Sequence, residues 1–199
     1  MRAIKVLSAM GLILVFGVGV GQAQVDCTTQ PGNVIVNCGF DTDVTSWGLV
    51  VGDLFGHAST AGDFALGAGT ADAADVGGGV YRARITSTAC VSGLPTTSDY
   101  EAGASFAIVG GGTPGIQCRI SVLWYINGCT VISDLDEGPW FVPTAGGWNR
   151  RGYSFGLVGG ENPQLILECE ADADFTALFD DAVVGLDWIP VELQSFSVE

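Results

Sequence analysis

The chain has 199 residues with 22 acidic and 7 basic side chains, which gives a formal net charge of −15. A surface this acidic repels phosphate backbones and anionic membranes, so nucleic acid is not an expected partner, whereas neutral sugars, cations and basic proteins remain open. The length fits one domain with a sizeable core.

The N-terminus has the pattern of a secretory signal peptide. Two basic residues precede an apolar run over 6–20, which closes on the small residues Gly21 and Ala23. At about fifteen residues this run is shorter than the roughly twenty that a bilayer span needs, so a membrane anchor is the weaker alternative. We expect a signal peptide at 1–23, one folded domain at 24–188, a tail at 189–199, and a secreted or cell-surface protein.

Short β-rich segments separated by glycine-rich turns make up the rest of the chain. No stretch after residue 24 repeats apolar residues at the spacing of an amphipathic helix. Glycine clusters at 77–79, 110–112, 146–147 and 159–160 predict turns or bulges. The predicted strands cover residues 33–37, 80–86, 105–109, 119–127, 152–157, 165–169 and 176–186. Strands of this length and spacing predict a β-sandwich or a barrel.

All six cysteines lie after the expected cleavage site, and an even number in an exported chain predicts disulfides. Cys118 and Cys129 flank one strand, which would hold them about 35 Å apart, so they should not pair. The turn-forming Pro31-Gly32 allows Cys27 and Cys38 to join. We expect the others to bridge across strands; the full set is Cys27, Cys38, Cys90, Cys118, Cys129 and Cys169.

Alternation inside the strands predicts which side chains face the core. In the strand at 119–127, Arg119 and Tyr125 lie on the face opposite the predicted core. That core face consists of Ile120, Val122, Trp124 and Ile126.

Charged side chains lie in mid-strand on one side of three predicted strands. Arg82 and Arg84 lie on the same face of their strand, and Glu168 and Glu170 lie on the same face of theirs. Arginines that face glutamates can form a satisfied surface ladder. They can also line a groove in which guanidinium and carboxylate groups hold sugar hydroxyls.

Two end motifs resemble those of carbohydrate-binding modules of families four and nine and their galactose-binding-like relatives. Asn-Val-Ile-Val-Asn-Cys-Gly-Phe-Asp at 33–41, followed by Trp47, is similar to their opening N-L-(I/V)-x-N-G-G-F-E…W. Phe-Asp-Asp-Ala-Val-Val-Gly-Leu at 179–186 is similar to their closing F-x-D-D-V-S-L. The resemblance implies an all-β, two-sheet antiparallel jelly-roll β-sandwich whose first and last strands lie close together. It also implies that Trp47 and Trp148 fill the core.

The same resemblance implies a structural calcium ion near the two ends. Its oxygen ligands would come from the backbone of Gly39 and the carboxylates of Asp41 and Asp181, with Asp180 as the alternative. Cys38 replaces a glycine of the family pattern, and Asp41 is shorter than the usual Glu. The competing interpretation is that Asp41 caps a turn and Asp180 hydrates an edge. A second acidic stretch at 134–138 is predicted to be a solvated turn.

Sugar recognition requires aromatic rings flanked by planar polar groups. Tyr125 is the preferred stacking residue and Trp140 the second choice. The polar groups expected to bind ligand beside them are Arg82, Arg84, Arg119 and Glu168.

The sequence contains few residues or motifs that are typical of enzyme active sites. His57 is the only histidine, and neither a G-x-S-x-G motif nor a phosphate-binding loop occurs. A glycosidase needs only two carboxylates about 5 to 10 Å apart, yet nothing singles out a pair. We therefore expect a non-catalytic protein.

Two function classes follow. The first is a carbohydrate-binding module for a neutral poly- or oligosaccharide, and the second is a structural or adhesive surface protein with the same fold and no sugar site. The tail at 189–199 resembles endings of bacterial exported proteins, which indicates a bacterial source. The high charge favours a monomer.

Overall fold

The computed structural model describes residues 27–29, 32–59, 61, 67–87, 99–110, 112–157 and 162–186. The predicted signal peptide, the predicted tail and Cys90 lie outside these ranges. Within them, no helix is long and apolar enough to cross a membrane.

Eleven strands and one short 3-10 helix form the described part of the chain. In chain order they are η1 (Cys27–Thr29), β1 (Trp47–Val51), β2 (Leu54–Ala58), β3 (Ala68–Asp72), β4 (Ala74–Gly77), β5 (Val80–Ser87), β6 (Asp99–Ile108), β7 (Gln117–Ile126), β8 (Val131–Glu137), β9 (Asn149–Leu157), β10 (Asn162–Ala171) and β11 (Thr176–Gly185).

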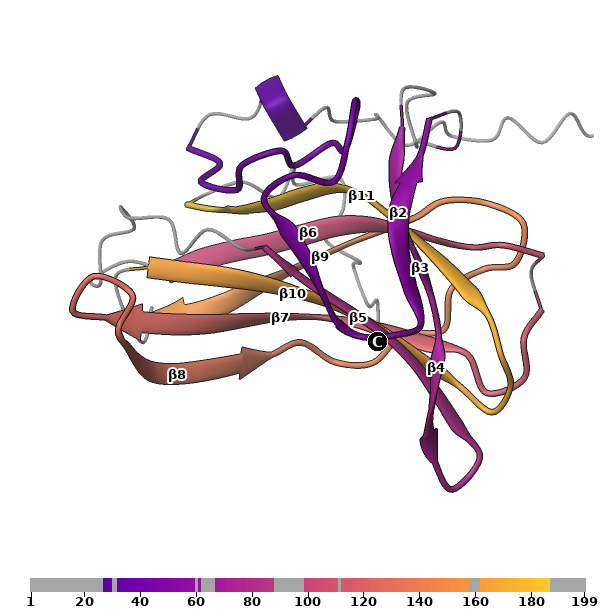
Figure 1. Cartoon of the computed structure of the whole chain (residues 1–199). Coiled ribbons are helices and arrows are strands. Elements are labelled where there is room, and N and C mark those ends of the chain that lie inside the picture. Colours follow the sequence, from indigo (N-terminus) through magenta and orange to yellow (C-terminus); the bar gives the residue numbers. More distant parts are fainter. Residues whose placement is uncertain are drawn as a thin grey trace, which may run out of the picture.

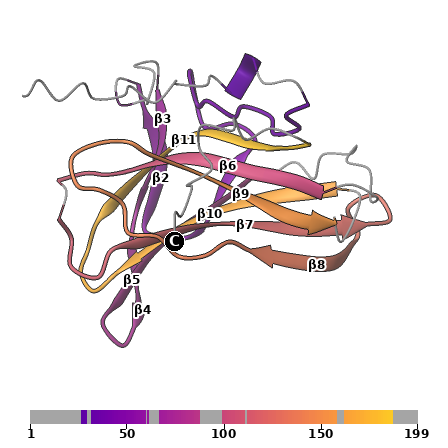
Figure 2. The same ribbon diagram turned by 180° about the vertical axis from the view of Figure 1, so that it is seen from behind.

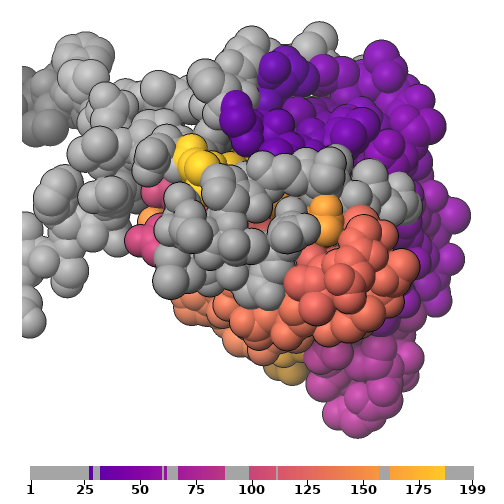
Figure 3. Space-filling view, turned by 90° about the vertical axis from the view of Figure 1, so that its left-hand side faces the viewer, coloured from indigo at the N-terminus to yellow at the C-terminus, as the bar shows by residue number. Residues whose placement is uncertain are grey.

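The strands form two antiparallel sheets that face each other across the core. The six-stranded sheet has the order β1-β5-β10-β7-β8, with β4 also paired to β5, and the five-stranded sheet has the order β2-β3-β11-β6-β9. Figures 1 and 2 show the two layers from opposite sides. The β4–β5 hairpin projects from the lower edge of the molecule (Figures 1 and 3). The predicted all-β, two-sheet sandwich is confirmed.

Alternating side chains of both sheets fill the core, as the period-two pattern predicts. Tyr100 and Phe106 of β6 and Trp124 of β7 are fully buried and contribute the largest rings. Tyr100 packs edge-on against Trp124 with ring centroids 4.6 Å apart. On β7 the predicted core face is confirmed for three of its four members, whereas Ile126, at the strand end, is only partly buried.

Disulfides close the fold at two described places. Cys118 of β7 lies directly opposite Cys169 of β10, and the two are bonded across the strands. Cys27 and Cys38 form a second bond. Cys129 is also disulfide-bonded. The predicted Cys27–Cys38 pair and the prediction that Cys118 does not pair with Cys129 are both confirmed.

The segment that precedes β1 runs beside β11. Residues 33–37 were predicted to be a strand, and this prediction is wrong because the segment makes only scattered bonds and turns at 36–39. It still joins the last strand: the Val34 N–H donates to the Val184 carbonyl at 3.0 Å, and the Ala182 N–H donates to the Cys38 carbonyl at 2.9 Å. The two ends of the domain therefore lie close together, as the resemblance implies (Figure 1).

The prediction of a solvated turn at 134–138 is also wrong. Residues 134–137 belong to β8, an edge strand paired along β7, and they do not form a turn. Asp136 faces the core side, where its carboxylate accepts hydrogen bonds from the Trp124 indole, at 2.8 Å, and from the Tyr100 hydroxyl. Burial, together with the bond to Asp136, raises the pKa of Tyr100 well above its usual range. The charge of Asp136 thus anchors an edge strand to the aromatic core.

Candidate functional site

Charged side chains from three neighbouring strands meet on the outer face of the six-stranded sheet. The pairing of β5, β10 and β7 places Arg84 opposite Glu168 and Glu168 opposite Arg119. One row further along, Arg82 lies opposite Glu170. The side chains that alternation placed on one face are thus brought into contact by strand order. We call Arg82, Arg84, Arg119, Glu168 and Glu170 the arginine–glutamate network.

Glu168 is the centre of this network. Its Oε1 lies 2.6 Å from Arg84 Nη2 and 3.1 Å from Arg82 Nε, and its Oε2 accepts a hydrogen bond from Arg119 Nε at 2.9 Å. The carboxylate is only 1% exposed, whereas the arginine side chains are 15 to 30% exposed. A buried anion therefore fixes three guanidinium groups that reach the surface.

Two further carboxylates complete the charge balance. Glu170 accepts hydrogen bonds from Arg82 at 2.6 Å and from Gln117 at 2.8 Å. Burial would raise the pKa of Glu170, but these hydrogen bonds and the neighbouring positive charges outweigh it and hold that pKa below its usual value. Glu137 lies 2.7 Å from Arg119. Three arginines thus meet three glutamates, so the network together with Glu137 carries no net charge.

Trp140 lies beside the network at the edge of the sheet. The guanidinium of Arg119 stacks over its ring, 4.4 Å from the centroid. After β8 the chain continues beside β7. The Gly138 N–H donates to the Ile120 carbonyl, and the backbones of Phe141 and Cys118 each donate a hydrogen bond to the carbonyl of the other. A Cβ at Gly138 would lie 2.8 Å from that carbonyl oxygen, so only glycine allows this close approach. Trp140 remains partly exposed.

Tyr125 lies on the same outer face near the far end of β7. It is partly buried, and its hydroxyl donates to Gln164 Oε1 at 2.9 Å. Six residues separate it from Arg119, which corresponds to about 20 Å along a strand. Exposed Leu135 and Ile132 of the neighbouring edge strand flank this end. The outer face therefore has a charged half beside Trp140 and a more apolar half around Tyr125.

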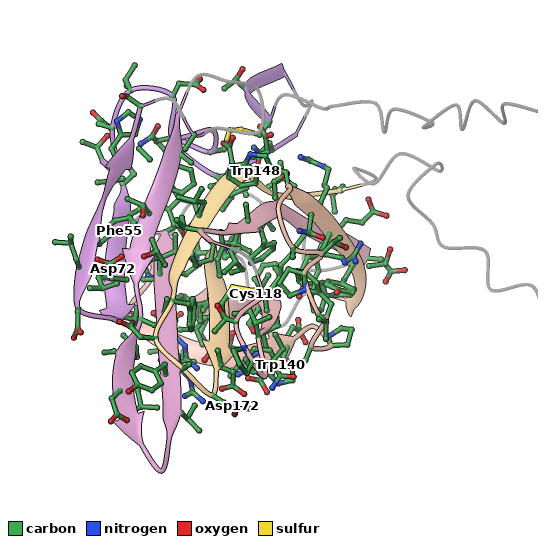
Figure 4. All side chains as sticks on the ribbon, turned by 90° about the vertical axis from the view of Figure 1, so that its right-hand side faces the viewer. Phe55, Asp72, Cys118, Trp140, Trp148 and Asp172 are labelled. Carbon is green, nitrogen blue, oxygen red and sulfur yellow. A yellow bond between two sulfur atoms is a disulfide. The ribbon has the colours of Figure 1, made fainter. Side chains whose placement is uncertain are left out.

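The other tryptophans in the described part of the chain lie elsewhere. Trp47 and Trp124 are buried in the core, as expected. Trp148 was expected in the core as well, but it is only partly buried and is not a core residue. Figure 4 shows Trp140 and Trp148 on opposite sides of the sandwich.

The residues expected to hold calcium are divided between two environments. Asp41 is exposed and, with Gly39, lines a pocket of about 250 Å³. Asp180 and Asp181 are buried in β11. No group of three His, Cys, Asp or Glu side chains in the described part of the chain is placed to hold a metal ion. Calcium binding itself stays a prediction.

Four polar members of the surface were not among the predicted site residues: Glu137, Glu170, Gln117 and Gln164. Glu137, Glu170 and Gln164 each contact a predicted site residue, whereas Gln117 contacts Glu170. Alternation could have placed Gln117 and Gln164 on the correct face. Glu137 could not be found because the acidic segment that contains it was not predicted to be a strand.

No protein-family model matches the sequence, and no curated protein matches it. Solved structures do share the fold. The CBM22-1 xylan-binding domain of Xyn10C from Paenibacillus barcinonensis matches with a TM-score of 0.58 at 14% identity, over 81% of this chain and 99% of that domain. A family 16 carbohydrate-binding module matches with a TM-score of 0.55 at 16% identity, over 76% and 99%.

The fold also occurs in larger chains. The enzymatically active domain of tailspike protein 4 from bacteriophage CBA120 matches with a TM-score of 0.56 at 11% identity, over 77% of this chain and 21% of that one. At such identities these similarities show the fold alone, a jelly-roll sandwich found in carbohydrate-binding modules. The likeness to families four and nine in particular stays a prediction.

Proposed function

We propose that this chain is a secreted, non-catalytic carbohydrate-binding module that holds a neutral glycan on the outer face of its six-stranded sheet. The observation that carries the proposal is the arginine–glutamate network beside Trp140. Its planar groups are fixed by the buried Glu168 and are suited to bidentate contacts with hydroxyls. The fold shared with carbohydrate-binding modules supports the same conclusion.

The charge balance of the network indicates a neutral ligand. Because the three arginines are already paired with three glutamates, an anionic sugar gains no unpaired cation there. The net charge of −15 adds long-range repulsion of polyanions. We therefore expect retention by neutral polysaccharides in affinity electrophoresis and none by polyuronates. Retention by polyuronates alone would contradict this assignment.

Trp140 is expected to be one aromatic anchor. Trp140→Ala should weaken glycan binding by about 2 kcal/mol, or roughly 30-fold, as is typical for truncation of an aromatic hot spot. Calorimetric titration with the retained oligosaccharide measures the change. Trp148→Ala is the matched control, because Trp148 is also partly buried but lies on the other side of the sandwich. Equal losses in both variants would argue against a site at Trp140.

Tyr125 is expected to be the second anchor. Tyr125→Ala should abolish retention on the polysaccharide while circular dichroism stays unchanged, since the residue packs on the outer face and not in the core. Tyr125→Phe keeps the ring and loses only the hydrogen bond to Gln164, so most of the retention should survive. If Tyr125→Ala is retained like the parent protein, the ligand does not reach this end of β7.

A structural or adhesive role is the second candidate, and one observation favours it. The strand β8 lies at the edge of its sheet in the described part of the chain and exposes Val131, Ile132 and Leu135, each at least 45% accessible. Exposed apolar edge strands are surfaces on which chains associate. A glycan array and light scattering on the mature protein discriminate the two. Oligosaccharide binding by a monomer supports the module, whereas a silent array with self-association supports the adhesive protein.

A further inference from the structure

The junction between the N-terminal segment and β11 is where the family resemblance implies calcium. Asp181 is one of the residues expected to bind the ion. It lies at a bulge in β11, where the register shifts between Asp180 and Val183, and its φ is 46°. The bulge interrupts the alternation of β11 at Asp181, which is only 2% exposed.

An arginine reaches this buried carboxylate from β9. Arg150 Nη1 lies 3.7 Å from Asp181 Oδ2, and the two side chains are 5% and 3% exposed. Strand order explains the contact: Arg150 pairs with Ser105 of β6, which pairs with Asp180 of β11. Arg150 Nη1 also donates to Ser105 Oγ at 3.4 Å. A positive charge is thus built into the sheet next to Asp181.

Several oxygens beside Asp181 already accept hydrogen bonds from protein groups. Asp181 Oδ1 accepts the Cys27 N–H at 3.3 Å. The side-chain amide of Asn33 donates to the carbonyls of Cys27 and Ala182, at 3.2 and 3.3 Å. Asp41, the third expected carboxylate, stays exposed and folds back over Gly39, with its Oδ1 3.2 Å from where a Cβ of that glycine would be.

This arrangement does not fit calcium. The ion takes six to eight oxygen ligands at about 2.3 to 2.6 Å. A dication that close to Asp181 would also lie against the guanidinium of Arg150, in a buried place where charge repulsion is poorly screened. We propose that Arg150 neutralises Asp181 in place of a calcium ion, so that the junction of the two chain ends is held without metal.

The wild-type protein gives the first test. Its Tm under non-reducing conditions should be the same in chelator and in millimolar calcium chloride, and calorimetric titration with calcium should give no binding heat. A bound ion would raise the Tm, because ligands that bind only the native state stabilise it. A Tm that rises with calcium and falls with chelator would overturn the proposal, and would leave the glycan site on the other sheet unaffected.

Substitution of the arginine gives the second test. Arg150→Met should lower the Tm by at least about 5 °C, because it leaves a buried carboxylate without its counter-charge. Adding Asp181→Asn should restore part of that loss. Arg151→Met is the matched control on the same strand, where the guanidinium instead stacks over Phe141. An Arg150→Met protein that is as stable as the control contradicts the proposal. If the Arg150→Met variant does not fold, the comparison of the wild-type protein in chelator and in calcium decides between the two possibilities.

Discussion

Glu168→Gln should destabilise the protein by about 3 to 5 kcal/mol, the range expected when one partner of a buried ion pair is removed. The substitution keeps the shape of the side chain and deletes the charge that Arg82, Arg84 and Arg119 all contact. The three guanidinium groups would then share a face with too few anions. Urea unfolding monitored by tryptophan fluorescence measures the loss as a lower midpoint at unchanged slope.

Glu137→Gln is the matched control for this change. Glu137 contacts the same Arg119 at 2.7 Å, but its side chain is 47% exposed, and exposed pairs contribute about 1 kcal/mol or less. The two variants therefore differ in the burial of the carboxylate and in the number of arginines that lose a partner. A Glu168→Gln protein within about 1 kcal/mol of the parent would show that the network is a satisfied surface ladder, the first of the two interpretations drawn from the sequence.

The disulfide between β7 and β10 should contribute about 4 kcal/mol. In the chain-entropy model a cross-link stabilises by restricting the unfolded chain, and the bond between Cys118 and Cys169 spans a separation of 51 residues. Cys118→Ala combined with Cys169→Ala removes it. The expected result is a drop in Tm of roughly 10 °C, measured by calorimetry.

The shorter bond is the comparison for this prediction. Cys27 and Cys38 are separated by 11 residues, so the same model gives about 3 kcal/mol for their removal. Their loss would also free the N-terminal segment from the junction with β11. A larger loss of stability for the short loop than for the long one would mean that native contacts, and not loop entropy, dominate the effect.

Strong local patterns predicted a large part of the fold. The strands β5, β7 and β11 were predicted over nearly their whole length, because their apolar residues recur at every second position between glycine-rich turns. β6, β9 and β10 were predicted over part of their length. The disulfide between Cys27 and Cys38 followed from a turn between two nearby positions, which is a local constraint as well.

Weak local patterns account for what was missed. β1 to β4 are short and rich in glycine and alanine, and β8 carries three acidic residues in seven. Such segments become strands because a neighbour offers free hydrogen-bonding groups, and β-propensity depends on that context. The segment at 33–37 shows the reverse case: its Val-Ile-Val run has high β-propensity, yet it forms no regular ladder.

Alternation was enough to predict outward faces for Arg82, Arg84, Arg119 and Glu168, because it is a property of each strand alone. Which of these side chains meet depends on how the strands are arranged in the sheet. Strand order places β10 between β5 and β7, so one carboxylate reaches three guanidinium groups, and the same kind of long-range pairing brings Arg150 of β9 to Asp181 of β11. These contacts join residues 31 to 86 positions apart, a separation at which no local period carries information about the partner.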